Sequence, residues 1–466
     1  MAAASLLNRL DAAIGSGLER STRAHHGRRL ARRGHVRAFD PPPRGWAQSG
    51  TFTPRSGSAV EFLVDGADVL PRMVADVGSA ESHVHVAGWF FTPGFRMGEG
   101  GPTLRELLAD AAGRVDVRVL AWAGAPLPLF HPDRREVREM RDELTRGTRI
   151  QMQLDANERP MHCHHEKLVL VDDRVAYVGG IDLTSFGGNR LDSSSHERRP
   201  GVGWHDACLR LEGPIVADVA EHYRLRWQGS LPAPQEPRAA GGLEAQLVRT
   251  VPEHLYDGLP QGEFTILESY LRALRGAERL VYLESQFLWS PELTAVLADK
   301  LRDPPHPDFR VVVVLPAKPN NGKDDTRGQL GVLVDAAKEG GTDERFLACT
   351  LFQAGGNAVY VHAKIGIVDD AWMTVGSANL NEHSLFNDTE VNVVVRDEAF
   401  IRAARLRLWE EHLEQAAEGA PHRVVDESWR PRAHVSSQDH KLRVLHGVSR
   451  RSQALRGPIN GLLVDG

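Results

Sequence analysis

A short pattern of histidine, lysine and aspartate occurs twice in this chain and constrains its fold more than any other feature. The two copies lie in HHEKLVLVDD and VHAKIGIVDD, and their members are His165, Lys167 and Asp172, then His362, Lys364 and Asp369. One offset of 197 residues relates all three positions and also carries Asp182 onto Asn379. Only seven of the 56 lysine and arginine residues are lysines, yet each copy contains one. Both positions therefore require a compact ammonium group rather than a planar guanidinium.

The residues around each copy predict a β-hairpin. The apolar runs LVLV and IGIV read as buried strands, and residues two apart on a strand share a face, so His165 and Lys167 point the same way. The Asp-Asp pairs at 172–173 and 369–370 predict turns, each followed by a second strand, VAYVGG or WMTVGS. Two such hairpins, packed about a pseudo-twofold axis, would bring two histidines and two lysines to one seam.

Length and element pattern predict two similar lobes. A chain of 466 residues exceeds the usual size of a single hydrophobic core. Strand and helix patterns alternate in both halves, which predicts an α/β protein made of two similar α-β-α sandwich lobes with the active site at their seam. We assign an arginine-rich arm to residues 1–50, the lobes to 51–235 and 243–420, a Pro/Ala/Gly-rich linker to 229–242, and a tail to 421–466.

The two ends of the chain leave their roles open. Residues 1–45 carry nine arginines against three acidic residues. One interpretation is a solvated or loosely docked arm, and the other is an interfacial segment attracted to anionic lipid. The C-terminal tail offers Ile459, Leu462 and Leu463 for packing back onto a lobe.

Composition indicates an ordinary globular protein. Hydrophobic residues make up 41% and charged residues 25%, and the net charge of −6 disfavours a generally basic nucleic-acid binder. Cys163, Cys208 and Cys349 are too few for a disulfide framework, which favours a reducing compartment. The N-terminus lacks the apolar region of a secretory signal, and no stretch has the 18 apolar residues of a membrane span. We expect a cytoplasmic monomer that contacts membranes only peripherally.

The duplicated HxKxxxxD pattern, with GG or GS after each hairpin, resembles the signature of the phospholipase D superfamily. The segments GGIDLTSFGGNRLDSSSH, WHDACLRLEGPIVADVAEHYRLRW and VGSANLNEHSLFNDTE are similar to segments of transphosphatidylating phospholipases D, and the resemblance spans residues 56–415. It implies a bilobal fold with the active site between the lobes and a ping-pong route through a phosphohistidine. One departure concerns headgroup recognition, because YLESQF has Ser285 where the family's YIENQYF stretch has asparagine.

Chemistry and resemblance together give the candidate residues their roles. A phosphodiester repels nucleophiles, so Lys167 and Lys364 would neutralise its charge, and Asn379 and Ser377 would add neutral donors to its oxygens. The resemblance implies that His165 attacks phosphorus and that His362 acts as general acid and then base, with the reverse assignment left open.

A nucleophilic imidazole needs an acceptor at its other nitrogen. Asp172 and Asp369 follow each histidine along the chain, and Asp182 and Glu390 are candidates from elsewhere in the seam. We expect His205 and Asp206, in the sequence WHD, to form a supporting hydrogen-bonded pair.

Two further features receive competing interpretations. The run His162, Cys163, His164 and His165 suggests a metal site, but neighbouring residues on a strand alternate faces and no second Cys/His cluster completes a tetrahedron, so we expect neither metal nor cofactor. The segments 88–95, 125–130 and 285–293 are aromatic and proline-rich; they form either core packing or an apolar rim for acyl chains. The polar stretch 317–329 would line the headgroup side of the entrance.

The leading functional interpretation is a phospholipase D that hydrolyses glycerophospholipids to phosphatidic acid or transfers the phosphatidyl group to an alcohol. Its partners would be a phospholipid, a transiently contacted membrane surface, and water or an alcohol as acceptor. A phosphatidyltransferase of the cardiolipin-synthase kind would use the same residues. A nuclease of the same superfamily is a further alternative, which net acidity disfavours. A non-enzymatic scaffold would predict a broken motif, and both motifs are complete.

Overall fold

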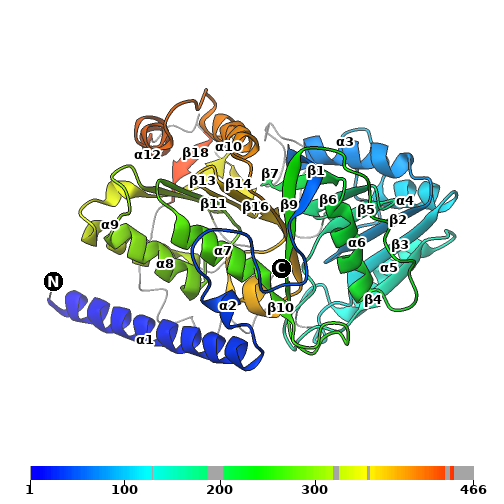
Figure 1. Ribbon diagram of the computed structural model, residues 1–466, viewed down its shortest axis with the longest axis horizontal. Helices are drawn as coiled ribbons and strands as arrows, with labels where there is room; N and C mark the ends of the chain where they lie inside the picture. Colours follow the sequence, from blue (N-terminus) through cyan, green and yellow to red (C-terminus); the bar gives the residue numbers. More distant parts are fainter. Residues whose placement is uncertain are drawn as a thin grey trace.

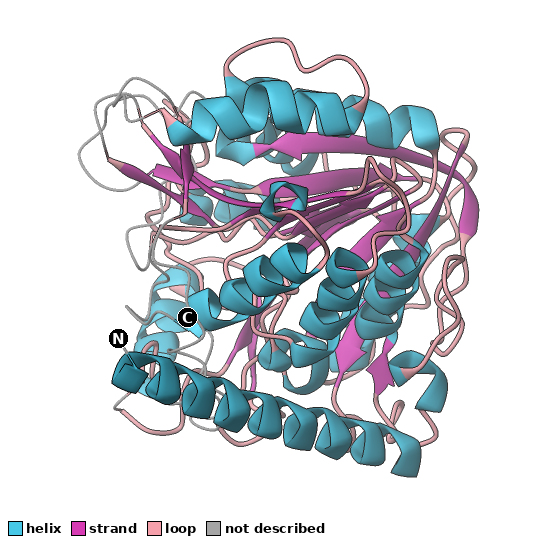
Figure 2. Ribbon diagram, turned by 90° about the vertical axis from the view of Figure 1, so that its left-hand side faces the viewer, coloured by secondary structure: helices cyan, strands magenta, loops and turns pink. Residues whose placement is uncertain are grey.

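Two β-sheets with the same strand order form the body of the molecule. The computed structural model describes residues 2–128, 130–185, 203–317, 325–353, 357–435 and 441–445. Figure 1 shows the two halves side by side, and Figure 2 shows the strands running through the middle with helices on the outside. This arrangement confirms the α/β class with two sandwich lobes.

Lobe 1 is built on a seven-stranded sheet. Its spatial order is β1 (Arg55–Val64), β8 (Ala207–Glu212), β6 (Val175–Gly179), β5 (Leu168–Val171), β2 (His83–Gly88), β3 (Asp116–Trp122) and β4 (Gln151–Asp155). The pairs β2–β3 and β3–β4 are parallel and the others antiparallel. The helices of this lobe are α3 (Asp65–Gly78), α4 (Leu104–Ala112), α5 (Arg134–Thr145) and α6 (Ile215–Arg226).

Lobe 2 repeats this plan. Its order is β9 (Leu243–Val251), β17 (Glu390–Val395), β16 (Trp372–Gly376), β15 (Ile365–Val368), β11 (Leu280–Glu284), β12 (Arg310–Val314) and β13 (Phe346–Phe352). The helices are α7 (Thr265–Gly276), α8 (Pro291–Arg302), α9 (Asp325–Glu339) and α10 (Glu398–Leu413). The short strand β10 (Glu263–Phe264) pairs with β9. The matching order is what a duplicated motif at one offset predicts.

Local sequence explains where the helices begin. Thr103 and Glu106 form a capping box at the start of α4, and Asp133 and Glu136 form another at α5. Ser290 accepts a hydrogen bond from the Leu293 amide ahead of α8, whose first residue is a proline. The parallel strand β12 reads RVVVV and is buried except at Arg310, as expected for a strand covered on both faces.

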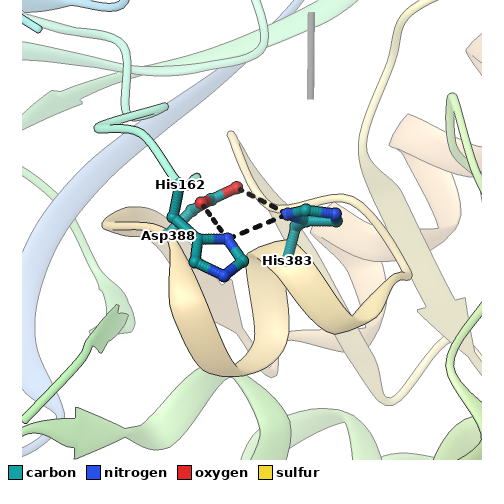
Figure 3. Close-up of side chains that lie close together, drawn as sticks. All are labelled: His162, His383 and Asp388. Carbon is teal, nitrogen blue, oxygen red and sulfur yellow. Dashed lines mark hydrogen bonds and ion pairs between the residues drawn. The ribbon is translucent and has the colours of Figure 1, made fainter. Parts of the chain in front are cut away.

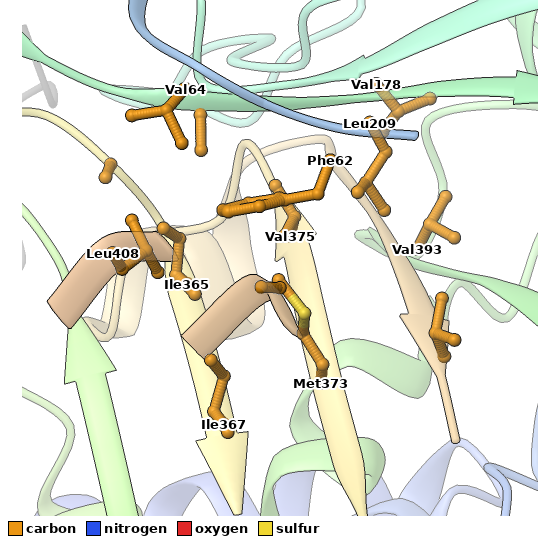
Figure 4. Packing of buried hydrophobic residues seen from close by; sticks show 14 of the residues in the cluster. Phe62, Val64, Val178, Leu209, Ile365, Ile367, Met373, Val375, Val393 and Leu408 are labelled. Carbon is orange, nitrogen blue, oxygen red and sulfur yellow. The ribbon is translucent and has the colours of Figure 1, made fainter. Parts of the chain in front are cut away.

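The two sheets pack face to face through a shared apolar core. Figure 4 shows Phe62, Val64 and Leu209 of lobe 1 opposite Ile365 and Val375 of lobe 2. Strand β1 also pairs with both β8 and β9, and β7 (Gly203–His205) of lobe 1 pairs with β14 (Ala358–Val361) of lobe 2. Core packing and strand pairing therefore both join the lobes at the seam.

The arginine-rich N-terminal segment forms a helix that docks on lobe 2. Helix α1 (Ala2–Arg32) runs beneath α8 in Figure 1. Its His26 bonds to Glu292 at 2.8 Å and stacks on Phe386, and its Arg29 pairs with Glu253 at 2.7 Å. A short helix α2 (Val36–Phe39) follows. The C-terminal half of α1 is thus held by specific buried contacts.

The remaining elements complete lobe 2. They are the short helices η2 (Asp343–Arg345), η3 (His383–Asn387), α11 (Pro421–Val424), η4 (Val425–Trp429) and α12 (Arg430–His434), and the strand β18 (Leu442–Val444), which pairs with β13. The apolar tail residues at 459, 462 and 463, and most of the stretch at 317–329, lie outside the described residues. The lobe boundaries proposed from sequence stay predictions. Across the described parts of the chain, no helix combines the length and the apolar character that crossing a membrane requires.

Candidate active site

The duplicated motif occupies equivalent places in the two lobes. His165 and Lys167 immediately precede β5, and His362 and Lys364 immediately precede β15. All four side chains are buried, with exposed fractions of 4% or less. Asp182 forms ion pairs with both Lys167 and His362, which brings residues of the two copies together.

Each histidine is held by the opposite lobe. His165 Nδ1–H donates to Glu390 Oε1 at 3.0 Å, and His362 Nδ1–H donates to Asp206 Oδ2 at 2.7 Å. The backbone repeats this reciprocity, because the amide of His165 donates to Thr389 O at 3.0 Å and that of His362 to His205 O at 2.8 Å. Each histidine is thereby held through its Nδ1 by a residue of the other lobe.

The two carboxylates are completely buried. Burial raises the pKa of Asp206 to about 7 and the pKa of Glu390 to about 8. Ser377 and Ser384 both donate hydroxyl hydrogen bonds to Glu390. Ser377, predicted to bind substrate, therefore orients the carboxylate that holds His165.

The two lysines are anchored to the histidine backbones. Lys167 Nζ donates to His165 O at 2.6 Å, and Lys364 Nζ donates to His362 O. Burial lowers the pKa of Lys364 to about 8. Asp182 Oδ2 lies 3.4 Å from Lys167 Nζ and 3.9 Å from His362 Nε2, so it bridges the two motifs. Burial and the charges of Lys364 and Lys167 hold the pKa of His362 well below its usual value.

The structure does not bring the motif aspartates to the histidines. Asp172 and Asp369 occupy the far ends of β5 and β15, at turns with φ of 55° and 54°. Asp172 accepts backbone hydrogen bonds from Glu81, Ser82 and His83. Asp369 does the same for the equivalent segment 278–280. These carboxylates fasten each hairpin to the start of the neighbouring strand.

Asn379 and Ser285 are linked through the loop after β16. Asn379 Nδ2 donates to Gln286 Oε1 at 3.4 Å, and its backbone amide donates to Ser384 Oγ at 3.0 Å. Ser285 Oγ accepts from the amide of Leu380 at 3.2 Å. Ser285, noted as a departure from the family pattern, thus supports the residue that follows Asn379.

His205 and Asp206 have different partners instead of bonding as a pair. Asp206 holds His362, whereas His205 Nδ1 lies 3.0 Å from Asp65 and Nε2 bonds to Glu284 at 2.8 Å. Glu284 also accepts from His412 Nε2 at 3.1 Å. Burial opposes protonation of His205, but Glu284 and Asp65 outweigh it and raise its pKa well above the usual value.

Several of these contacts had no predicted counterpart in the sequence. The sequence predicts Asp206 only as a supporting residue and indicates no role for Glu284, His412 or Asp65. One signal was available: Asp206 and Glu390 stand at the start of equivalent strands in WHDACLRL and NDTEVNVVV. The aromatic segments, in contrast, mainly form core. Trp89, Phe91, Phe95 and Phe287 are buried, and Leu127 is 53% exposed.

Within the described parts of the chain, two groups made entirely of buried side chains have metal-ligand spacing without belonging to the histidine pairs. One is His205, Glu284 and His412, and the other is His162, His383 and Asp388. Both ring nitrogens of His205 already face carboxylates, at 3.0 and 2.8 Å. The second group is considered further below.

The chain is similar in sequence to one family model and to several known proteins. The family described as "Cardiolipin synthase, PLD-like domain" matches residues 270–410. The chain is 24% identical to phospholipase D A of Dictyostelium discoideum, over 78% of this chain and 36% of that protein. It is 25% identical to the major cardiolipin synthase ClsA of Bacillus subtilis, over 73% of this chain and 66% of that protein.

Two other matches extend the comparison. Cardiolipin synthase B of Escherichia coli is 25% identical over 75% of this chain and 79% of its own length. Among solved structures, phosphatidylserine synthase of Haemophilus influenzae superposes with a TM-score of 0.57 at 12% identity, covering 77% of this chain and 87% of that one. This superposition supports the fold alone.

Proposed function

Because the chain belongs to the phospholipase D superfamily, we propose that it is a phosphodiesterase that acts on glycerophospholipids at a membrane surface. It would transfer the phosphatidyl group to water, giving phosphatidic acid, or to an alcohol. The reciprocal pairing of His165 with Glu390 and of His362 with Asp206 carries this proposal. Two buried imidazoles with fixed tautomers, beside two lysines, suit attack on a phosphodiester.

In the first half-reaction, Nε2 of His165 attacks phosphorus. A nitrogen–phosphorus bond forms and the bond between phosphorus and the headgroup oxygen breaks. His362 enters this step as an imidazolium with a proton on each ring nitrogen, and it gives the Nε2 proton to the leaving oxygen. Lys167 and Lys364 offset the charge of the phosphoryl oxygens, as does the amide of Asn379. The phosphate anion also counters the lysine charges that hold the pKa of His362 low.

In the second half-reaction, His362 acts as base. It takes a proton from water or an alcohol, whose oxygen then bonds to phosphorus as the nitrogen–phosphorus bond breaks. The free enzyme is restored and no cofactor is consumed. Because the two pairs are nearly symmetric, the reverse assignment of nucleophile and acid predicts the same products.

A phosphatidyltransferase of the cardiolipin-synthase kind is the second candidate. It is favoured by the share of the relatives that the chain matches. The match covers 66% and 79% of the two cardiolipin synthases but only 36% of phospholipase D A. In that reaction the acceptor alcohol would be a hydroxyl of a second phospholipid headgroup.

Product analysis separates these reactions. Purified protein is incubated with vesicles of phosphatidylethanolamine and phosphatidylglycerol, with and without a primary alcohol, beside His165→Ala and His362→Ala. Phosphatidic acid or phosphatidyl-alcohol supports the phospholipase D reaction, and cardiolipin supports the transferase. Cleavage of an oligonucleotide without lipid turnover would overturn the lipid proposal.

A rapid quench in alkaline denaturant, which preserves the acid-labile nitrogen–phosphorus bond, identifies the nucleophile. With phosphorus-labelled lipid, the covalent label should be retained on His165 in the His362→Ala protein and be absent from the His165→Ala protein. Label on His362 instead would reverse the two roles.

A further inference from the structure

Three buried polar side chains converge where the two lobes meet beside the His165–Glu390 pair. Figure 3 shows His162 of lobe 1 facing His383 and Asp388, which come from η3 and the residue after it. The two histidine Nδ1 atoms are 3.0 Å apart, and His162 Nδ1 is 3.3 Å from Asp388 Oδ1. His383 Nδ1 is 4.0 Å from Asp388 Oδ2. Imidazole nitrogen and carboxylate oxygen are common ligands of divalent transition metals.

Hydrogen bonds among these three side chains satisfy their polar atoms poorly. A neutral imidazole has one donor and one acceptor nitrogen, so if Nδ1 of His162 accepts a hydrogen bond from His383, it has no hydrogen to donate to Asp388. If His162 donates to Asp388, the contact between the two Nδ1 atoms lacks a shared proton. In addition, Asp388 Oδ2 is buried and has no hydrogen-bond partner among the described residues. An unsatisfied buried carboxylate oxygen is costly.

We propose that His162 Nδ1, His383 Nδ1 and the Asp388 carboxylate bind one divalent transition-metal ion, with Zn²⁺ as the best match. Tetrahedral ligands at about 2.0–2.1 Å from Zn²⁺ lie about 3.3 Å from one another. The observed separations of 3.0 and 3.3 Å are close to this value, and rotation of the carboxylate would shorten the third. Three protein ligands leave one coordination position for water.

The surroundings support the ligands. The backbone amide of Cys163 donates to Asp388 Oδ1 at 3.0 Å, and such a second partner fixes the orientation of a metal-binding carboxylate. The positive charge of Arg159 reaches His162, but this guanidinium is paired with Glu253 at 3.2 Å. The ion would tie the segment leading into His165 to the segment leading into Glu390. It would therefore be a structural metal that positions the first histidine pair.

This proposal revises the expectation that the chain binds no metal. That expectation rested on the absence of further ligands near His162 in the sequence. The partners His383 and Asp388 come more than 200 residues later and meet His162 only in the folded protein.

The test is metal binding by the full-length protein, with Zn²⁺ and Co²⁺ as probes. The protein is first stripped of metal with a chelator, then loaded with Zn²⁺ and dialysed. We expect one Zn²⁺ per chain by elemental analysis and a rise in Tm of about 3 °C at saturating metal. Co²⁺ should give the strong visible absorption of a tetrahedral site. His162→Gln and His383→Gln should each weaken binding by about tenfold or more.

A matched control is His222→Gln, which alters another buried histidine, paired with Glu166 at 2.8 Å and outside both groups with metal-ligand spacing. It should bind metal as the wild-type protein does. Absence of stoichiometric metal in the wild-type protein, or equal binding by all three variants, overturns the proposal. If the variants fail to fold, X-ray absorption of the zinc-loaded wild-type protein decides: two imidazoles plus oxygen ligands support the site, and any other number of imidazoles overturns it.

Discussion

Four ionisable side chains at the seam are set by their surroundings to titrate far from their ordinary values. Burial raises the pKa values of Asp206 and Glu390 to about 7 and about 8. Burial also lowers the pKa of Lys364 to about 8 and, with the lysine charges, lowers that of His362. Small changes in local charge therefore redistribute protons among these groups. A bound phosphodiester anion is such a change, which is the physical basis for the acid and base steps proposed here.

Replacing one oriented carboxylate tests the importance of the fixed tautomer. Asp206→Asn keeps the shape of the side chain but removes the anion that accepts the Nδ1–H of His362. Because His362 can then adopt the wrong tautomer, we expect kcat to fall by about 10² to 10⁴-fold while the protein remains folded. Steady-state kinetics and a thermal melt measure both quantities. Asp110→Asn, at an exposed residue, serves as control; a loss below threefold for Asp206→Asn would show that the pair is dispensable.

The dependence of kcat/KM on pH should report the protonation state of Lys364. Its ammonium is charged below a pKa of about 8 and neutral above it, so attraction for the phosphate declines as the pH rises through that value. The charged groups around it are Lys167, Asp206, Asp182 and Glu390. We expect kcat/KM for the lipid to decrease above about pH 8. Lys364→Arg stays charged and should lack this alkaline decline even if its activity is lower; an unchanged decline in that variant would assign the titration to another group.

At the scale of elements, the hairpins combine two separate functions at their two ends. The end that carries the histidine and lysine meets the other lobe, and the turn end is fixed by its aspartate to the start of a neighbouring strand. Backbone amide bonds hold the pKa of Asp172 low, against the opposing effect of burial. The repeated aspartate therefore acts through the fold of the hairpin.

Removing a turn aspartate should cost stability rather than chemistry. Asp172→Ala loses several charge-assisted hydrogen bonds and places alanine at a φ of 55°, so we expect the free energy of unfolding to fall by about 2–3 kcal/mol. Asp369→Ala should behave alike. Urea unfolding measures the loss, and kcat of the folded fraction should stay within about threefold of wild type. A selective loss of kcat without destabilisation would show that these residues take part directly in the reaction.

The repeat in the sequence predicts the elements better than the contacts between them. Strands β5, β6, β15 and β16 follow from local patterns that need no tertiary information. The partner of His362 is different, because Asp206 approaches it across the seam from a strand 156 residues away. The same holds for Glu284 and for the proposed metal ligands. Apolar aromatic segments such as Trp89–Phe95 also look alike in sequence whether they are buried or exposed.

At the scale of the whole molecule, the two lobes share one interior. Their inner sheet faces form a common apolar core, and buried polar side chains cross the same interface. One such network of side chains consists of Asp65, His205, Glu284 and His412. Lobe 1 supplies the first two residues and lobe 2 the last two. All four are buried, so the carboxylates must balance the imidazolium charge of His205. We infer that the lobes unfold together.

Disrupting this buried network of side chains should destabilise the entire protein. Glu284→Gln removes the carboxylate that accepts from both His205 and His412 and leaves a buried imidazolium with less compensating charge. We expect the free energy of unfolding to fall by about 3 kcal/mol in a single urea transition, detected alike by tryptophan fluorescence and circular dichroism. The control is Glu339→Gln, whose ion pair with Arg302 is exposed and should contribute less than about 1 kcal/mol. Two separate transitions would mean that the lobes unfold independently. Equal effects of the two substitutions would mean that the apolar core and the strand pairing alone hold the lobes together.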